Sequence, residues 1–285
     1  MNPRKLLQAI VVPYDVDRQD TGGARGPREL LARGFPERLR EAGWEVQEDE
    51  IRCRREGAAK EETVAEVGRG IAEAVALAHE RRRFPLVLAG GCLAAVGTVA
   101  GLQRLGRDVA VVWIDAHGDF NTPETSPSGY WDGMALAAVC GRSLPAVCGK
   151  IELQPLQCRN VVHLAGRAFD PQEIEDIRRL ELAVVPPDQI CGEPALRRLR
   201  RCIDGRQLYL HVDLDGIDPQ DAPAVGFPVP GGPRLDDLLR CLAELPTPAA
   251  MTFSAMSFDR ATGEESGRMI ETCLRLVEAL GVRLP

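Results

Sequence analysis

Short apolar runs alternate with longer amphipathic stretches along most of the chain. Several runs are hydrophobic at every position, which is typical of strands in a parallel sheet that helices cover on both faces. The pattern predicts strands at Ala9–Val12, Leu86–Leu88, Val109–Ile114, Val161–Leu164, Ala183–Val185, Leu208–Val212 and Ala250–Phe253. It predicts helices at Pro27–Arg40, Glu62–Arg82, Ala94–Arg104, Pro171–Arg179, Ala195–Ile203, Leu235–Leu242 and Gly263–Leu280.

These elements predict one α/β domain. No repeat, low-complexity tract or long linker interrupts the alternation of strands and helices, which is the pattern of layered α/β folds. We therefore expect a single domain over residues 1–285, built as a three-layer αβα sandwich on a mainly parallel sheet. Ligands of such sheets bind at the carboxyl ends of the strands. The residues that follow the predicted strands are the first place to look for chemistry.

Composition narrows the class of protein. The net charge of −7 argues against a sequence-independent nucleic-acid binder, which needs a basic surface. The nine cysteines are scattered and form no C-x-x-C pair, so we expect free thiols in a reducing, cytoplasmic environment. The uncharged segment Pro85–Leu102 is interrupted by glycines. It fits a buried strand, a turn and a helix better than a membrane span.

Two predicted strands end in clusters of metal-binding side chains. D-x-H-x-D follows one strand (Asp115, His117, Asp119) and D-x-D follows another (Asp213, Asp215). Extended residues two positions apart share a face, so each cluster can converge on one point. Carboxylates with one imidazole suit Mn²⁺ or a similar ion, and two bridged metals can turn water into a nucleophile near neutral pH. Acidic residues after a strand also cap helices or form turns, but that alternative accounts less well for both clusters together.

The two clusters resemble the strongest signatures of the ureohydrolases, the arginase and agmatinase superfamily. Those signatures are Asp115–Asn121 and Asp213–Pro219. Gly23–Pro27, Ser128–Met134 and Ala222–Gly232 resemble the family's early glycine-proline loop, its substrate loop and the segment after its second metal motif. The resemblance runs along nearly the whole chain. It implies an arginase-like sandwich that hydrolyses a small guanidino compound with two Mn²⁺ ions, as a homo-oligomer without nucleic-acid or membrane partners.

One metal-binding position departs from the family pattern. The family's first motif is Gly-Gly-Asp-His, and its histidine binds a metal, whereas this chain has Gly90-Gly91-Cys92-Leu93. Alignment on Gly97 places Gly91 at the aspartate and Cys92 at the histidine; a different gap would place Leu93 there and lose the ligand. A Cys92 thiolate and four aspartates carry five negative charges, whereas two divalent metal ions carry four positive charges. The excess negative charge weakens the metals as Lewis acids and raises the pKa of a bridging water. Thiolate is also softer than the ligands Mn²⁺ prefers, so this position would bind Mn²⁺ weakly or take another metal. A purely structural cysteine is the alternative.

The resemblance also implies roles for the other site residues. Asp119 would hold the nucleophilic water and pass its proton to the leaving amine, and Asp132, which stands where the family has a proton-shuttling histidine, would assist. Asn121, Ser128, Asp170 and Glu173 match family positions that handle the amino-acid end of arginine. The implied metal ligands are Cys92, Asp115, His117, Asp119, Asp213 and Asp215.

A substrate-binding position also differs from the family pattern. The family has a glutamate that pairs with the guanidinium, and the alignment places Ser257 there. Because a hydroxyl gives a cation no charge partner, a less basic guanidine such as N-hydroxy-L-arginine fits better than arginine. Two alternatives stay open at this point. One is a single-metal amide hydrolase of the deacetylase type, and the other is a non-catalytic subunit with a degraded site.

Overall fold

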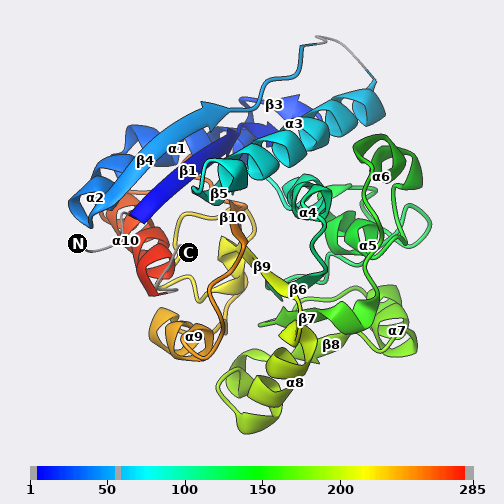
Figure 1. The fold of residues 1–285 in the computed structure, drawn as a ribbon. Coiled ribbons are helices and arrows are strands. Elements are labelled where there is room, and N and C mark those ends of the chain that lie inside the picture. Colours follow the sequence, from blue (N-terminus) through cyan, green and yellow to red (C-terminus); the bar gives the residue numbers. More distant parts are fainter. Residues whose placement is uncertain (1–4, 55–58, 280–285) are drawn as a thin grey trace.

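An eight-stranded sheet forms the centre of the computed structural model, which describes residues 5–54 and 59–279. Its order is β4-β1-β5-β10-β9-β6-β7-β8, and every neighbouring pair is parallel (Figure 1). A separate hairpin pairs β2 (Tyr14–Asp15) with β3 (Arg18–Gln19). The strands of the large sheet are β1 (Lys5–Val12), β4 (Trp44–Glu50), β5 (Phe84–Ala89), β6 (Val109–Ile114), β7 (Val161–Leu164), β8 (Ala183–Val185), β9 (Gln207–Asp213) and β10 (Ala250–Ser254).

Helices cover both faces of this sheet, so the predicted three-layer sandwich is confirmed (Figure 1). One face carries α1 (Gly26–Ala32), α2 (Phe35–Glu41), α8 (Glu193–Ile203), α9 (Leu235–Leu242) and α10 (Gly263–Ala279). The other carries α3 (Lys60–Glu80), α4 (Ala94–Arg104), α5 (Ala135–Val139), α6 (Pro145–Ile151) and α7 (Pro171–Arg179). Short 3₁₀ helices are η1 (Gly22–Arg25), η2 (Asp132–Met134), η3 (Cys158–Asn160), η4 (Pro187–Gln189) and η5 (Leu214–Gly216).

The central strands are buried and mostly apolar because they supply both hydrophobic cores. Along β5, Leu86 and Leu88 pack into the core under α1 and α2, while Val87 and Ala89 pack into the core under α3 and α4. Successive side chains of a strand point to opposite faces. A strand covered on both faces therefore shows no polar alternation in its sequence.

Most predicted elements are found within a few residues of their expected bounds, with two kinds of difference. The predicted helix Pro27–Arg40 is two helices, because Gly34 adopts a φ of 93° and Pro36 opens the second helix. Strand β4 and the short helices α5 and α6 were not predicted. Strand β4 lies at the sheet edge and is rich in acids, as edge strands often are. The predicted helix end at Leu280 lies outside the described residues.

The segment Pro85–Leu102 contains strand β5, a turn and most of helix α4, as its glycines suggested. Among the residues that the structure describes, no helix is long and apolar enough to cross a membrane.

Helices α3 and α4 approach each other closely at a glycine. A Cβ atom at Gly101 would lie 2.7 Å from the backbone oxygen of Ala72 and 2.9 Å from the Cβ of Val75. We expect Gly101→Ala to lower the free energy of unfolding by about 1–3 kcal/mol, because the helices must separate. The same change at exposed Gly267 of α10, where nothing lies within 4 Å, is expected to raise it by about 0.5–1 kcal/mol. Urea unfolding measures both, and equal effects would contradict this packing.

Candidate metal and active site

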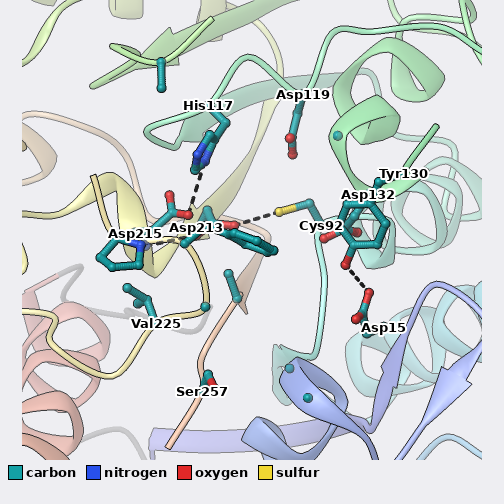
Figure 2. Close-up of a pocket in the computed structure, with 18 of the residues that line it drawn as sticks. Asp15, Cys92, His117, Asp119, Tyr130, Asp132, Asp213, Asp215, Val225 and Ser257 are labelled. Carbon is teal, nitrogen blue, oxygen red and sulfur yellow. Dashed lines mark hydrogen bonds and ion pairs between the residues drawn. The ribbon is translucent and has the colours of Figure 1, made fainter. Parts of the chain in front are cut away.

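The carboxyl ends of four adjacent strands, β5, β10, β9 and β6, surround one cavity of about 970 Å³ (Figure 2). The turn after β5 carries Cys92, and the segments at the ends of β6 and β9 carry the two acidic motifs. Five of the six predicted metal ligands line this cavity: Cys92, His117, Asp119, Asp213 and Asp215. The sixth, Asp115, is buried at the end of β6. The structure therefore brings the whole predicted ligand set to one edge of the sheet.

Two groups of these side chains are compact enough to hold a metal ion. In one group the ligand atoms of Cys92, Asp115 and Asp119 all lie within 4.8 Å of one another. The same limit holds for Asp115, His117 and Asp215 in the second group. Asp115 belongs to both groups, so one carboxylate stands between two candidate metal positions.

The acidic motifs are fixed by local hydrogen bonds. The indole Nε1 of Trp113 donates to Asp115 Oδ2 (3.0 Å), and the backbone N–H of His117 donates to Asp115 Oδ1 (2.7 Å). At the end of β9 the backbone N–H of Asp215 donates to Asp213 Oδ1 (2.9 Å). Each first aspartate thus binds the backbone two residues further on, as aspartates in turns do. His117 Nδ1 reaches across to Asp215 Oδ2 at 3.3 Å.

The thiol of Cys92 points into the same cluster (Figure 2). Its Sγ lies 2.9 Å from Asp213 Oδ2 and 3.2 Å from Ser254 Oγ. Burial raises the pKa of this thiol, and the charges of Asp213 and Asp119 raise it further. Without metal the thiol is therefore protonated and donates to Asp213. Leu93, the alternative occupant of this position, packs in the hydrophobic core instead.

The donor set fits divalent metal ions. Asp119 Oδ2 is buried and has no hydrogen-bond partner among the residues that the structure describes. Asp119 also holds a left-handed backbone conformation, with φ of 50°, which costs of order 1 kcal/mol. Burial and the charge of Asp115 raise the pKa of Asp119, and burial and the charge of Asp215 raise that of Asp213. Buried carboxylates without a counter-charge are costly, and a bound cation would offset that cost.

Without metal ions, protons on the site residues supply the positive charge that balances the buried carboxylates. Hydrogen bonds to Asp115 and Asp215 raise the pKa of His117 to about 11. Burial alone would raise the pKa of Asp115, but its hydrogen bond to His117 and the nearby imidazoles lower it overall. Because metal ligands must be deprotonated, metal entry at this site must release protons.

We expect the metal-free protein to lose stability as the pH rises from about 7 to 8.5. Asp119, Asp213 and His117 all have raised pKa values in the folded state. Their stabilising contribution is therefore present at low pH and declines as the pH rises towards those folded-state values. The contributions of Asp115 and of the buried imidazoles of His79, His163 and His211, whose pKa values are all lowered, are complete above about pH 7 and stay constant over this range.

Mn²⁺ is expected to reverse this trend. At about 100 times its Kd it adds about 2.7 kcal/mol per site, and the gain grows with pH because the ligands lose protons more easily. Thermal melts with Mn²⁺ and with a chelator, at about pH 7 and about pH 8.5, measure this difference directly. A larger rise in Tm at the lower pH would count against the site.

Three of the four predicted amino-acid-binding residues, Asn121, Asp170 and Glu173, are joined by hydrogen bonds in one wall of the cavity. Asn121 Nδ2 donates to Asp170 Oδ2 (2.8 Å). The carboxylate of Glu173 accepts from the backbone N–H groups of Phe120 (2.9 Å) and Asp170 (2.8 Å), and burial raises its pKa. Asp170 and Glu173 form the capping box of α7. Ser128 lines the cavity and is exposed.

Ser257 and Asp132, which replace a glutamate and a histidine of the family pattern, lie in different parts of the cavity. Ser257 lines the cavity in the segment after β10, where its backbone N–H donates to Ala224 O at 2.9 Å. Asp132 lies beside Cys92 (Figure 2), and its Oδ1 accepts from the backbone N–H of Leu93 at 2.9 Å. Burial raises the pKa of Asp132 to about 6.

Several groups around the site were missed in the sequence. Ser254 contacts Cys92, and the Nε2 atom of His211 lies 3.3 Å from Ser254 Oγ. Asp15 accepts a hydrogen bond from the Tyr130 hydroxyl at the cavity wall (Figure 2). Ser254 ends β10 of the parallel sheet, so the rule that ligands bind at the strand ends of such sheets was a usable signal for it. Asp15 ends a strand of the separate hairpin, and the rule gave no signal there.

The fold and the ligand set together define an α/β metallohydrolase. Its ligands end adjacent parallel strands, which is where such sheets bind their ligands. Oxygen, imidazole and thiolate donors around a shared carboxylate suit divalent transition metals that activate water.

Comparison with known proteins gives the family. A model of the arginase family matches residues 7–259. The arginase of Bacillus caldovelox is 34% identical over 246 residues, which cover 80% of this chain and 82% of that protein. The crystal structure of arginase from Bacillus cereus superposes with a TM-score of 0.85 at 32% identity, covering 98% of this chain and 99% of that one.

The chain belongs to the arginase family. It is a metal-dependent ureohydrolase, and enzymes of this class hydrolyse C–N bonds of linear amidines. The resemblance stated from the sequence motifs is confirmed. The family assignment favours the ureohydrolase over the two alternatives, the single-metal amide hydrolase and the non-catalytic subunit.

Proposed function

We propose that this ureohydrolase acts on a weakly basic, modified arginine such as N-hydroxy-L-arginine. The observation that carries the proposal is the uncharged cavity wall formed by Phe227, Ala255 and Ser257. The next carboxylate along this segment, Asp259, is ion-paired with Arg25. A guanidinium buried against this wall would lack a charge partner. A hydroxyguanidine is less basic and can bind in its neutral form, with the Ser257 hydroxyl as a hydrogen-bond partner.

We further propose two Mn²⁺ ions per chain. When bound, they would supply Lewis acidity and lower the pKa of water. Asp213, which contacts Cys92, lies beside both positions. The residues that would hold them are Cys92, Asp115 and Asp119 for one ion, and Asp115, His117 and Asp215 for the other.

Asp119 is the residue we assign to proton transfer. Its buried, unpartnered Oδ2 is free to take a proton from the attacking water. Burial and the neighbouring carboxylates raise its pKa, which favours holding that proton until the leaving nitrogen accepts it. Water adds to the guanidine carbon, the bond from that carbon to the side-chain nitrogen breaks, and the nitrogen leaves protonated. N-hydroxy-L-arginine would thus give L-ornithine and hydroxyurea.

The wall around Asp170 is assigned to the amino-acid end of the substrate. Asp170 would offer its carboxylate to an ammonium group, and Asn121 and Ser128 would offer hydrogen bonds. Glu173 acts differently, because its two oxygens already hold the backbone of Phe120 and Asp170; it fixes the shape of the wall. A homo-oligomeric state and the absence of nucleic-acid partners remain predictions.

A product assay tests the proposal. Protein loaded with Mn²⁺ is incubated with N-hydroxy-L-arginine or with L-arginine, and ornithine, hydroxyurea and urea are quantified by chromatography. We expect ornithine and hydroxyurea, with a higher kcat/KM for the hydroxylated substrate. Equal turnover of both substrates, or faster turnover of arginine, would sink the proposal.

A further inference from the structure

Two positions where the chain departs from the ureohydrolase motifs, Cys92 and Asp132, meet in space. Oδ1 of Asp132 accepts from the backbone N–H of Leu93 at 2.9 Å. Figure 2 shows the two side chains next to each other, although strand β6 lies between them in the sequence. The carboxylate of Asp132 therefore binds the backbone of the turn that carries the thiol.

Gly91 makes room for this contact. A Cβ atom at Gly91 would lie 2.6 Å from each carboxylate oxygen of Asp132, which is closer than any stable contact. The backbone of Gly91 is outside the left-handed region, so its conformation does not require glycine. The approach of Asp132 is what requires it.

The turn gains a helix cap from this carboxylate. Helix α4 begins directly after Leu93, whose side chain is apolar and cannot cap the helix. A carboxylate at this end accepts free N–H groups and is favoured by the helix dipole. Asp132 is itself held in place, because the backbone oxygen of Gly133 accepts from the N–H of Asn121 at 3.3 Å and Tyr130 is bonded to Asp15.

We propose that Asp132 is a positioning residue for Cys92 and does not carry protons in the reaction. It fixes the turn 90–93 so that the Cys92 Sγ faces Asp213 and Ser254. An aspartate at position 91 would bind the Leu93 N–H from within the turn, two residues on, as an Asx turn. Here the same carboxylate comes from another loop. Gly91 and Asp132 both differ from the family motifs, and we interpret the two differences as a single change, in which the carboxylate that holds the turn has moved from position 91 to position 132. This inference rests on Cys92 being a metal ligand.

Protein loaded with Co²⁺ tests this inference, because a thiolate ligand gives Co²⁺ a charge-transfer absorption band. We expect Asp132→Ala to weaken metal binding at the Cys92 position by roughly 10- to 100-fold, the usual effect of losing a group that orients a ligand. The band should fade in parallel. The double variant Gly91→Asp with Asp132→Ala returns a carboxylate to the turn and should restore the band. Glu124→Ala, an exposed carboxylate on the same cavity loop, is the matched control and should leave it unchanged.

The outcomes separate this inference from the proposed function. Asp132→Ala with full affinity and an unchanged band would overturn it, as would a folded double variant without the band. A wild-type protein that binds Co²⁺ without a thiolate band would overturn it too. If Asp132→Ala does not fold, Asp132→Asn is used in its place, because the amide keeps one acceptor for the Leu93 N–H. This variant should keep the thiolate band but bind Co²⁺ less tightly. Unchanged Co²⁺ affinity would overturn the inference. Failure to hydrolyse N-hydroxy-L-arginine, with the band behaving as expected, would remove the proposed function alone.

Discussion

Replacing Asp115 by asparagine is expected to lower kcat/KM by more than about 100-fold, beyond the usual cost of losing an outer-shell partner of a metal ligand. Asp115 is the carboxylate shared by the two candidate metal groups, so both positions lose an anionic ligand at once. The amide keeps the size of the side chain but only one acceptor, whereas Trp113 Nε1 and the His117 N–H bond to different oxygens of Asp115. One of these two hydrogen bonds is therefore lost, and circular dichroism of the variant separates the loss of metal and turnover from a loss of fold.

Metal content and kinetics check this expectation together. Elemental analysis of Asp115→Asn should give less than about one metal ion per chain, since both sites are weakened. Glu124→Gln makes the same carboxylate-to-amide change on the exposed part of the cavity loop and should behave as wild type. An Asp115→Asn protein that keeps its metal and its turnover would show that Asp115 does not bridge two ions.

Introducing a carboxylate at Ser257 is expected to shift the ratio of kcat/KM values towards arginine by roughly 10- to 100-fold. A hydrogen bond to a charged group contributes about 1.5–3 kcal/mol. Ser257 offers a guanidinium no charge, and the next carboxylate along the segment, Asp259, is ion-paired with Arg25. The backbone of Ser257 is fixed by its bond to Ala224, so a longer side chain extends from a defined position.

The comparison needs two variants and both substrates. Ser257→Glu adds the charge, and Ser257→Gln adds the same bulk without it. Steady-state kcat/KM values for L-arginine and N-hydroxy-L-arginine give the preference of each variant. The same shift in both variants would mean that size, and not charge, sets the preference at this wall.

The buried strands could be predicted closely because their physics is local. β6 and β7 are buried at every position, and each is bounded by polar residues or turns, so their ends were visible. Helix α5 could not be found in this way, since Ala135–Val139 is short and apolar at every position and shows no helical period. The acids of β4 hid an edge strand that pairs along one side only.

In the candidate site too, local contacts could be predicted from the sequence and long-range contacts could not. The bonds from Asp115 to His117 and from Asp213 to Asp215 span two residues, so the motif spacing predicted them. The contact of Asp132 with the Cys92 turn depends on how two distant loops pack. Sequence spacing carries no record of that packing. Glu173 could be predicted in part. Its D-x-x-E spacing from Asp170 is that of a helix capping box, and this explains why its carboxylate binds backbone N–H groups.

The metal content of three proteins tests most directly whether Cys92 completes a two-metal site. Wild type, Cys92→His and Cys92→Ala are purified without chelator, loaded with Mn²⁺ and analysed by elemental analysis per chain. We expect about two ions in wild type and Cys92→His, and about one in Cys92→Ala, because only the position built on residue 92 loses its ligand. About one ion in wild type, rising to about two only in Cys92→His, would contradict a metal-binding role for the native thiol.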